Sequence, residues 1–169
     1  NRAGLKAVGL SGKDGQMVMA KKRWHLSTDE SGMESKIDLG QVGDVQKVNT
    51  KLLRLLLDQG FTPVITCIAS DEEGNDYNIN ADVFAGKMAA ALGVDDYIVL
   101  TDVDGLYADY PDPSSIVPRI TLEKLPFYYQ SIISGGMKPK IESCEAAVRA
   151  GVKRAVILNG TKPEQISDF

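Results

Sequence analysis

The chain has 169 residues, of which 43% are hydrophobic and 25% are charged, and this composition is typical of a folded globular domain rather than of a disordered chain. Its formal net charge of -4 argues against a nucleic-acid-binding surface, because a phosphate backbone requires clustered Lys and Arg. The short basic run 21–23 is interpreted as the solvated end of a strand. The sequence contains no run of eighteen apolar residues, so it predicts no membrane-spanning segment.

The cysteine and histidine content points away from a metal centre. The two cysteines, Cys67 and Cys144, do not have the spacing of a zinc site or a redox pair, and they are compatible with a reducing, cytoplasmic compartment. The single histidine, His25, has no Cys or His neighbour in the sequence. We therefore predict no metal centre built on cysteine or histidine.

The first part of the chain favours extended structure. Residues 5–10 form a short apolar strand, residues 17–22 form a second one, and the turn 11–15 between them predicts that the two strands pair as a hairpin. Residues 27–35 are polar and small, which is typical of a mobile loop.

From Asn49 onward the pattern changes to alternating helices and strands. Asn49 is expected to cap a helix with a leucine-rich face that ends at Gly60, and residues 61–69 then form a buried strand. The remaining elements are predicted in this order: a short strand around 77–80, a helix over 81–92, a strand over 97–101, a helix over 139–150 and a strand over 155–158.

Strands and helices that alternate at these spacings are typical of βαβ crossovers. The sequence therefore predicts an α/β fold in which a mainly parallel sheet carries helices on both faces. Ligands bind such a sheet at the carboxyl ends of its strands. Three polar segments fall at these ends, namely residues 78–82, 101–107 and 134–140.

The first of these segments places two asparagines and an aspartate at the junction between a strand and a helix. Amide groups and a carboxylate at this place are suited to hold a polar ligand, but one of them is also expected to cap the helix. Capping is as good an explanation as ligand binding for Asn80, whereas it explains Asn78 less well, because one helix needs one cap.

The second segment, Thr101-Asp102-Val103-Asp104-Gly105-Leu106-Tyr107, follows a buried strand. It is suited to bind a ribose or a phosphate through Thr101 and through backbone N–H groups. Asp102 and Asp104 are either metal ligands or members of a tight turn, and two aspartates before a glycine more often form a turn.

The third segment, Ser134-Gly135-Gly136-Met137-Lys138-Pro139-Lys140, brings paired glycines to the start of a helix. Glycines let the backbone approach a ligand closely, and the N–H groups of a helix start attract phosphate. Lys138 and Lys140 lie at the unfavourable end of the helix dipole for a cation, so an anionic ligand would compensate them. The sequence contains neither a P-loop nor a G-x-G-x-x-G motif, so a nucleotide would be held by a different cradle.

Taken in order, these segments resemble the amino-acid kinase family, and within it the branch that phosphorylates N-acetylglutamate. The resemblance covers nearly the whole chain and rests on residues 7–15, 40–45, 71–82, 100–107 and 134–140. It implies the carbamate kinase-like, or amino-acid kinase, fold. It also implies that residues 1–169 form a single α/β domain, the C-terminal ATP-binding portion of such a kinase, which is incomplete at the N-terminus. Within it, residues 1–48 are expected to form a hairpin and loop region near a lobe junction.

The resemblance assigns roles to individual residues. Lys140 neutralises charge on the transferring phosphoryl group, Asp82 holds the catalytic lysines in place, and Asn78 binds the acyl amino acid. ATP, with Mg²⁺ held mainly by its phosphates, is expected to contact Thr101, Asp102, Val103, Asp104, Gly105, Leu106, Tyr107, Ile132, Ile133, Ser134, Gly136 and Met137. The acceptor carboxylate is already ionised at neutral pH, so no general base is needed.

The sequence also departs from the family pattern. The resemblance leads us to expect an earlier glycine-rich loop with a second catalytic lysine, a substrate arginine and a final strand, and none of these is recognisable here. A partial chain that binds nucleotide and catalyses poorly is therefore expected. A sister kinase acting on carrier-linked aminoadipate or glutamate, an inactive nucleotide-binding fragment and a non-catalytic binding or oligomerisation module remain alternatives. The full-length protein is expected to be a cytoplasmic homo-oligomer.

Overall fold

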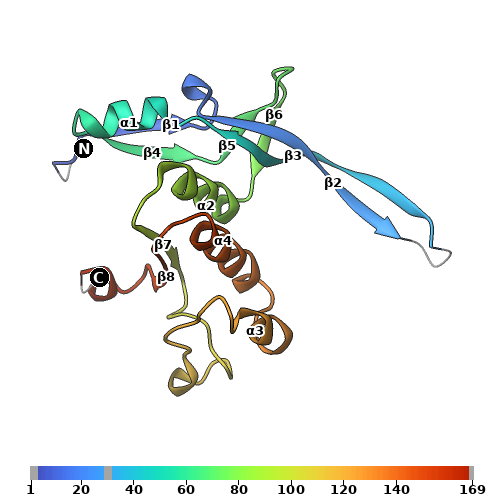
Figure 1. The fold of residues 1–169 in the computed structure, drawn as a ribbon, viewed down its shortest axis with the longest axis vertical. Coiled ribbons are helices and arrows are strands. Elements are labelled where there is room, and N and C mark those ends of the chain that lie inside the picture. Colours follow the sequence, from blue (N-terminus) through green and yellow to red (C-terminus); the bar gives the residue numbers. More distant parts are fainter. Residues whose placement is uncertain (1–3, 29–31, 168–169) are drawn as a thin grey trace. The chain divides into compact units, whose positions relative to one another are not determined.

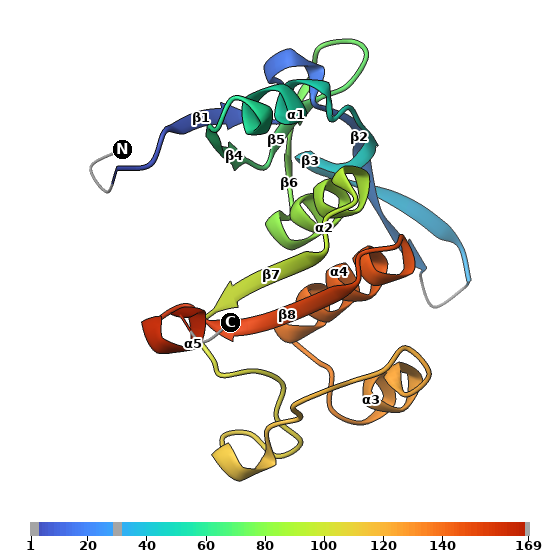
Figure 2. The ribbon, with the colours of Figure 1, turned by 60° about the vertical axis from the view of Figure 1, so that its left-hand side comes forward.

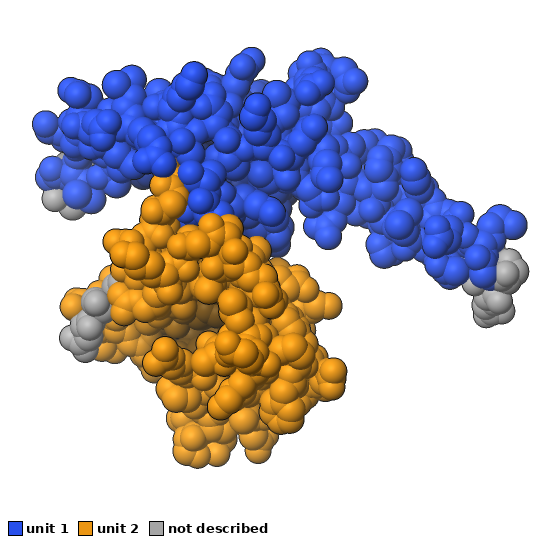
Figure 3. Space-filling model, in the orientation of Figure 1, with its two compact units in different colours: residues 1–91 blue, residues 92–169 orange. Residues whose placement is uncertain are grey.

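The computed structural model describes residues 4–28 and 32–167. The chain forms two compact units, residues 1–91 and residues 92–169, which Figure 3 colours separately. Each unit is described by itself below. Within the described residues, no helix has both the length and the apolar character needed to cross a membrane.

Unit 1 begins with a parallel pair of strands joined through a helix. Strand β1 (Ala7–Ser11) pairs with β4 (Thr62–Thr66), and α1 (Lys51–Asp58) precedes β4 in the chain (Figure 1). The predicted helix is present, but its cap residue is Thr50, whereas Asn49 uses its side-chain oxygen to accept from the Lys51 N–H at 3.2 Å. The helix therefore begins one residue later than expected.

The hairpin predicted between residues 5–10 and 17–22 is wrong. Strand β2 (Val18–Thr28) instead pairs antiparallel with β3 (Glu34–Val48). The turn after β1 explains the difference, because the Asp14 carboxylate accepts from the Ser11 N–H at 2.6 Å and from its hydroxyl at 2.9 Å. This compact turn, with a 3-10 helix over Asp14–Gln16, leads the chain away from β1 and leaves that strand to pair with β4.

The long β2–β3 hairpin also replaces most of the predicted loop. Both strands extend into the range 27–35, and residues 29–31 lie outside the described part of the chain. Strands β2 and β3 close a small barrel with β6 (Asp76–Ile79) and β5 (Ile68–Ser70). The side chains buried along its strands include Val18, Ala20 and Ile79.

The strand predicted over residues 61–69 is two strands, β4 and β5, which belong to different sheets. It is also less buried than its composition suggests, since Val64 is 57% exposed. Helix α2 (Ala81–Leu92) has the predicted bounds, and it buries Phe84 and Met88.

Unit 2 is built on a second parallel pair, β7 (Asp96–Thr101) and β8 (Arg154–Asn159), which lie side by side in register (Figure 2). Helix α4 (Met137–Arg149) packs against both strands. The segment between β7 and α4 carries a 3-10 helix (Pro113–Ser115) and α3 (Leu125–Ser131), and α5 (Pro163–Ser167) follows β8. Leu106, Leu125, Ile133 and Ile141 form the core beneath this segment.

Candidate functional site

A cavity of about 410 Å³ lies in unit 2, at the carboxyl end of β7 and the start of α4. This volume is within the range of small-molecule sites. Two of the three segments that the sequence singled out supply most of its walls. The lining residues are Thr101, Asp102, Val103, Gly105, Leu106, Tyr107, Tyr110, Ile132, Ser134, Gly136, Met137 and Lys140.

The first wall is the loop that leaves β7. Gly105 is buried and has φ +148°, a backbone conformation that strongly favours glycine. Its neighbour Leu106 is 7% exposed, and the Leu106 carbonyl accepts from the Val117 N–H at 2.8 Å. Leu106 therefore anchors the loop in the hydrophobic core. Above it, Tyr107 and Tyr110 meet edge to face, with ring centroids 5.4 Å apart.

The second wall is the glycine turn before α4. Gly135 has φ +53°, and the helix begins at Met137 after Gly136, with no side-chain cap among the described residues. The positive end of the helix dipole therefore faces this wall without a local acidic cap. Lys140, which lines the cavity one turn further on, adds a cationic side chain.

The two lysines of this turn have different surroundings. Lys138 Nζ lies 3.9 Å from the Glu142 carboxylate, and Lys138 is exposed and absent from the cavity wall. Lys140 is half-buried and lines the cavity. An anion in the cavity would therefore meet the helix start and Lys140 together.

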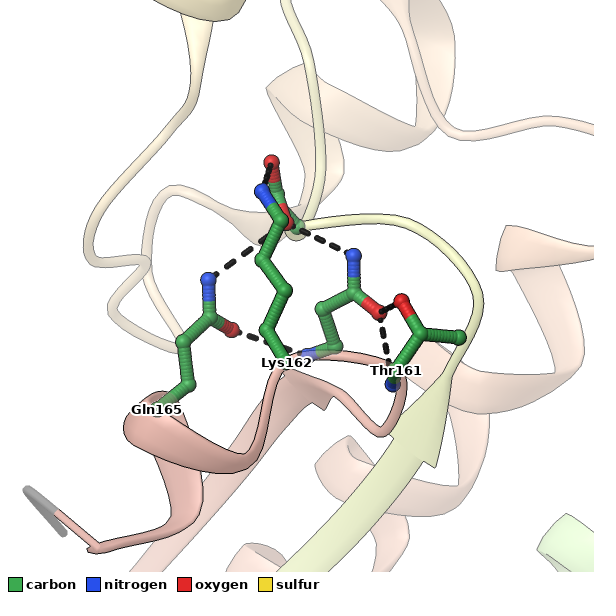
Figure 4. Close-up of polar contacts among 5 residues, drawn as sticks. Thr161, Lys162 and Gln165 are labelled. Carbon is green, nitrogen blue, oxygen red and sulfur yellow. Dashed lines mark hydrogen bonds and ion pairs between the residues drawn. The ribbon is translucent and has the colours of Figure 1, made fainter.

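Two residues predicted to contact the nucleotide do not line this cavity. Ile133 is 6% exposed and belongs to the hydrophobic core. Asp104 points its carboxylate toward the end of β8 and the segment after it, where Asn159, Lys162 and Gln165 donate to it (Figure 4). These donors hold the pKa of Asp104 below its usual value, with the Lys162 hydrogen bond as the largest cause.

The predicted substrate residue Asn78 lies in unit 1. It is exposed on β6, where it pairs with Val42 of β3 and Ile68 of β5. Its side-chain oxygen lies 3.9 Å from the Cys67 thiol, and the Ile79 N–H donates to the Cys67 carbonyl at 2.9 Å. Asn78 is thus held at the centre of the strand group, with an exposed amide.

Asn80 and Asp82 occupy the start of α2. Asn80 Oδ1 accepts from the Val83 N–H at 3.1 Å, so this asparagine caps the helix. Asp82 lies in the first turn, where the helix dipole stabilises a carboxylate. Capping is therefore the role that the structure gives to Asn80.

The strand that carries Asn78 is fixed by a polar turn before it. The Asp71 carboxylate accepts from the Tyr77 hydroxyl at 2.9 Å and from the Asn75 N–H at 2.8 Å. The hydrogen bond to Asp71 raises the pKa of Tyr77. Lys13 Nζ donates to Asp76 at 2.5 Å, which ties the turn after β1 to the start of β6 and lowers the pKa of Asp76.

Sequence reasoning missed Tyr110, which lines the cavity and is 70% exposed. It lies in the run Asp109-Tyr110-Pro111-Asp112, whose composition indicates only a turn. Within the described residues, no group of three or more His, Cys, Asp or Glu side chains is arranged to hold a metal ion.

Comparison with known proteins assigns the chain to a family. The model of the amino acid kinase family matches residues 1–159. Acetylglutamate kinase of Heliobacterium modesticaldum is 44% identical over 166 residues, which are 98% of this chain and 56% of that protein. Acetylglutamate kinase of Archaeoglobus fulgidus is 45% identical over 166 residues, which are 98% of this chain and 57% of that protein.

A solved structure supports the predicted architecture. Carbamate kinase of Giardia matches with a TM-score of 0.70 at 15% identity, over 99% of this chain and 61% of that chain, which shows a shared fold. The α/β fold of the carbamate kinase type is thereby confirmed. The chain spans a little over half the length of the curated relatives it matches. With a family model that covers residues 1–159, the chain belongs to the amino acid kinase family.

Proposed function

We propose that this chain forms the ATP-binding portion of a kinase that phosphorylates the side-chain carboxylate of N-acetyl-L-glutamate, the step named by its acetylglutamate kinase relatives. The observation that carries the proposal is the cavity in unit 2, where the loop after β7 and the start of α4 meet around Lys140. Residues 1–169 would act together as this portion, in a cytoplasmic enzyme of arginine biosynthesis.

The cavity combines the two kinds of surface that a nucleotide needs. Leu106, Ile132 and Met137 offer apolar contacts, and Tyr107 offers an aromatic ring for a nucleobase. The start of α4 and the Lys140 ammonium offer positive potential for phosphate groups. The residues present therefore fit a nucleoside triphosphate.

Phosphoryl transfer depends mainly on positioning and on stabilising negative charge. Lys140 would supply that stabilisation from the chain itself. The acceptor carboxylate is ionised at neutral pH, so the reaction requires no base to remove a proton. The ionised acceptor carboxylate can therefore act as the nucleophile without a catalytic base.

Bound Mg²⁺ would supply further charge neutralisation on the phosphates. Asp104 is not suited to hold this ion, because Lys162, Asn159 and Gln165 already occupy its carboxylate oxygens. Asp102 is exposed and is the one carboxylate among the residues that line the cavity, and one carboxylate is too few to form a metal cage. We therefore propose that the phosphates hold the ion, with no dedicated protein cage.

We assign the acyl amino acid to Asn78 and the orientation of the catalytic lysines to Asp82. The exposed amide of Asn78 can donate to a carboxylate or to an acyl oxygen. The polar turn 71–76 and the Lys13–Asp76 pair fix the strand that carries it. These features support the assignment of a rigid polar contact to this position.

Acyl-phosphate formation by the whole protein tests the proposal. Hydroxylamine displaces phosphate from an acyl phosphate to give a hydroxamate, which forms a coloured complex with added ferric ion, so the assay can compare N-acetyl-L-glutamate, L-glutamate and aminoadipate with Mg-ATP. We expect turnover of N-acetyl-L-glutamate and a loss of about 10²–10³ in kcat for Lys140→Met. Lys138→Met is the matched control, since Lys138 lies on the same helical turn outside the cavity.

Two results would contradict the proposal. Preferred turnover of L-glutamate or aminoadipate would assign the chain to a sister kinase. Equal activity of Lys140→Met and Lys138→Met would remove Lys140 from the reaction.

A further inference from the structure

The Asp104 carboxylate is the centre of a polar network within unit 2. Figure 4 labels two of its donors, Lys162 and Gln165. Lys162 Nζ donates to its Oδ2 at 2.7 Å, Asn159 Nδ2 donates to its Oδ1 at 2.7 Å, and Gln165 Nε2 lies 3.4 Å from the same Oδ1. The three donors come from the end of β8 and the start of α5, about 55 to 61 residues further along the chain.

The donor side of this network is itself fixed. Asn159 is 5% exposed, and its side-chain oxygen accepts from the Thr161 N–H at 2.9 Å and from the Thr161 hydroxyl at 2.6 Å. The Asn159 N–H in turn donates to Gln165 Oε1 at 3.0 Å. Because both ends of the Asn159 amide are engaged, its N–H₂ group is held toward Asp104.

The acceptor side belongs to the loop that lines the cavity. Asp104 lies between Val103 and Gly105, which both line it, although Asp104 does not. A second tie lies at the base of the loop, where the Gly160 N–H donates to the Thr101 carbonyl at 2.8 Å. The segment 159–165 therefore holds the loop at two points and stays outside the cavity wall.

We propose that Asp104 and Lys162 are positioning residues that hold loop 102–107 in the form that lines the nucleotide cavity. The inference rests on the proposed function. A loop that must be ordered on binding lowers the observed affinity by the fraction of molecules in the competent form. The Asp104–Lys162 pair orders the loop before the ligand binds, so no affinity is lost to ordering it. Asp104 therefore raises the affinity for the nucleotide although it does not line the cavity.

The test compares Lys162→Met with Lys153→Met in the chain. Lys153 Nζ lies 2.8 Å from Asp95, at the opposite end of the same pair of strands, so this variant removes an ion pair of similar length away from the cavity. We expect the Kd for Mg-ATP, measured by isothermal titration calorimetry, to rise about tenfold in Lys162→Met and to stay unchanged in Lys153→Met. Lys162→Arg should restore the affinity, because it keeps a cationic donor to Asp104.

A second measurement needs no nucleotide. Amide hydrogen exchange of residues 102–107 should accelerate in Lys162→Met, while exchange in α4 and β7 stays at the wild-type rate. Three results would overturn this inference and leave the proposed function intact: an unchanged Kd in Lys162→Met, an equal rise of the Kd in Lys153→Met, or unchanged hydrogen exchange of the loop. A wild-type chain that binds no Mg-ATP would contradict the proposed function, and this inference with it.

Discussion

The side chain of Asn80 accepts a hydrogen bond from the backbone N–H of Val83 at 3.1 Å, and this contact closes the first turn of α2. Asn78 lies two residues earlier, on β6, and does not cap the helix. The two asparagines of one short segment therefore have different physical roles, one in the helix and one on an exposed strand position.

Asn80→Ala should lower the free energy of unfolding by about 0.5–2 kcal/mol, the usual cost of a lost cap. Urea denaturation followed by circular dichroism measures this change. Asn80→Ser, which keeps a capping oxygen, should recover most of the loss. An alanine variant as stable as the wild type would show that the Asn80–Val83 contact does not stabilise α2.

Asn78→Ala should leave stability nearly unchanged and should weaken substrate binding. Its side chain is exposed and its one described contact is the weak 3.9 Å approach of the Cys67 thiol, so we expect little change in the unfolding midpoint. In the whole protein, the KM for N-acetyl-L-glutamate should rise at least tenfold, with the KM for ATP unchanged. An equal rise of both KM values would contradict a specific role in binding the acyl amino acid.

A close approach within unit 1 predicts a steric effect. A Cβ atom on Gly12 would lie 2.7 Å from the Ile68 carbonyl oxygen and 3.0 Å from the Phe84 ring, and Gly12 is buried. Gly12→Ala should therefore destabilise the chain by about 1–3 kcal/mol in urea denaturation. Gly9→Ala is the matched control on β1, since nothing lies within 4 Å of its added Cβ. Similar stabilities for the two variants would contradict this account of Gly12.

The carboxylate contacts predict how stability depends on pH. The pKa of Asp76 is lowered from 3.8 mainly by the Lys13 hydrogen bond, and that of Asp104 mainly by the Lys162 hydrogen bond. A group with a lowered pKa in the folded state stabilises it above the unfolded pKa and loses this effect as pH falls through the folded value. The urea midpoint should therefore decrease as the pH falls below roughly 4, the ordinary range of an aspartate, toward the lowered folded-state pKa values. Asp76→Asn and Asp104→Asn should each weaken this dependence, and an unaltered acid profile in both would contradict it.

The sequence predicted the helices and strands that have strong local signals. The bounds of α2 were predicted correctly because small apolar residues fill it and Gly93 ends it. The fold class was also predicted correctly, because helices and strands that alternate along the chain form βαβ units. The pairing of β1 was predicted wrongly, because a turn-like sequence over 11–15 does not reveal that its partner strand follows α1.

The candidate cavity could be predicted in part. Two polar segments at predicted strand and helix ends line one cavity, and parallel-sheet geometry explains why. The orientation of individual side chains could not be predicted, since alternate residues of a loop do not follow a fixed period. Asp104 and Ile133 point away from the cavity, and Tyr110 lines it from a segment whose composition indicates only a turn.

Binding of Mg-ATP to the chain tests the central claim most directly. A ligand at about a hundred times its Kd stabilises the folded state by roughly 2.7 kcal/mol, which a thermal unfolding titration detects readily. We predict a saturable rise of the melting temperature in the wild type and in Lys138→Ala, and a much weaker rise in Lys140→Ala. A folded wild-type chain whose melting temperature does not respond to Mg-ATP, or an undiminished response in Lys140→Ala, would contradict a nucleotide site built around Lys140.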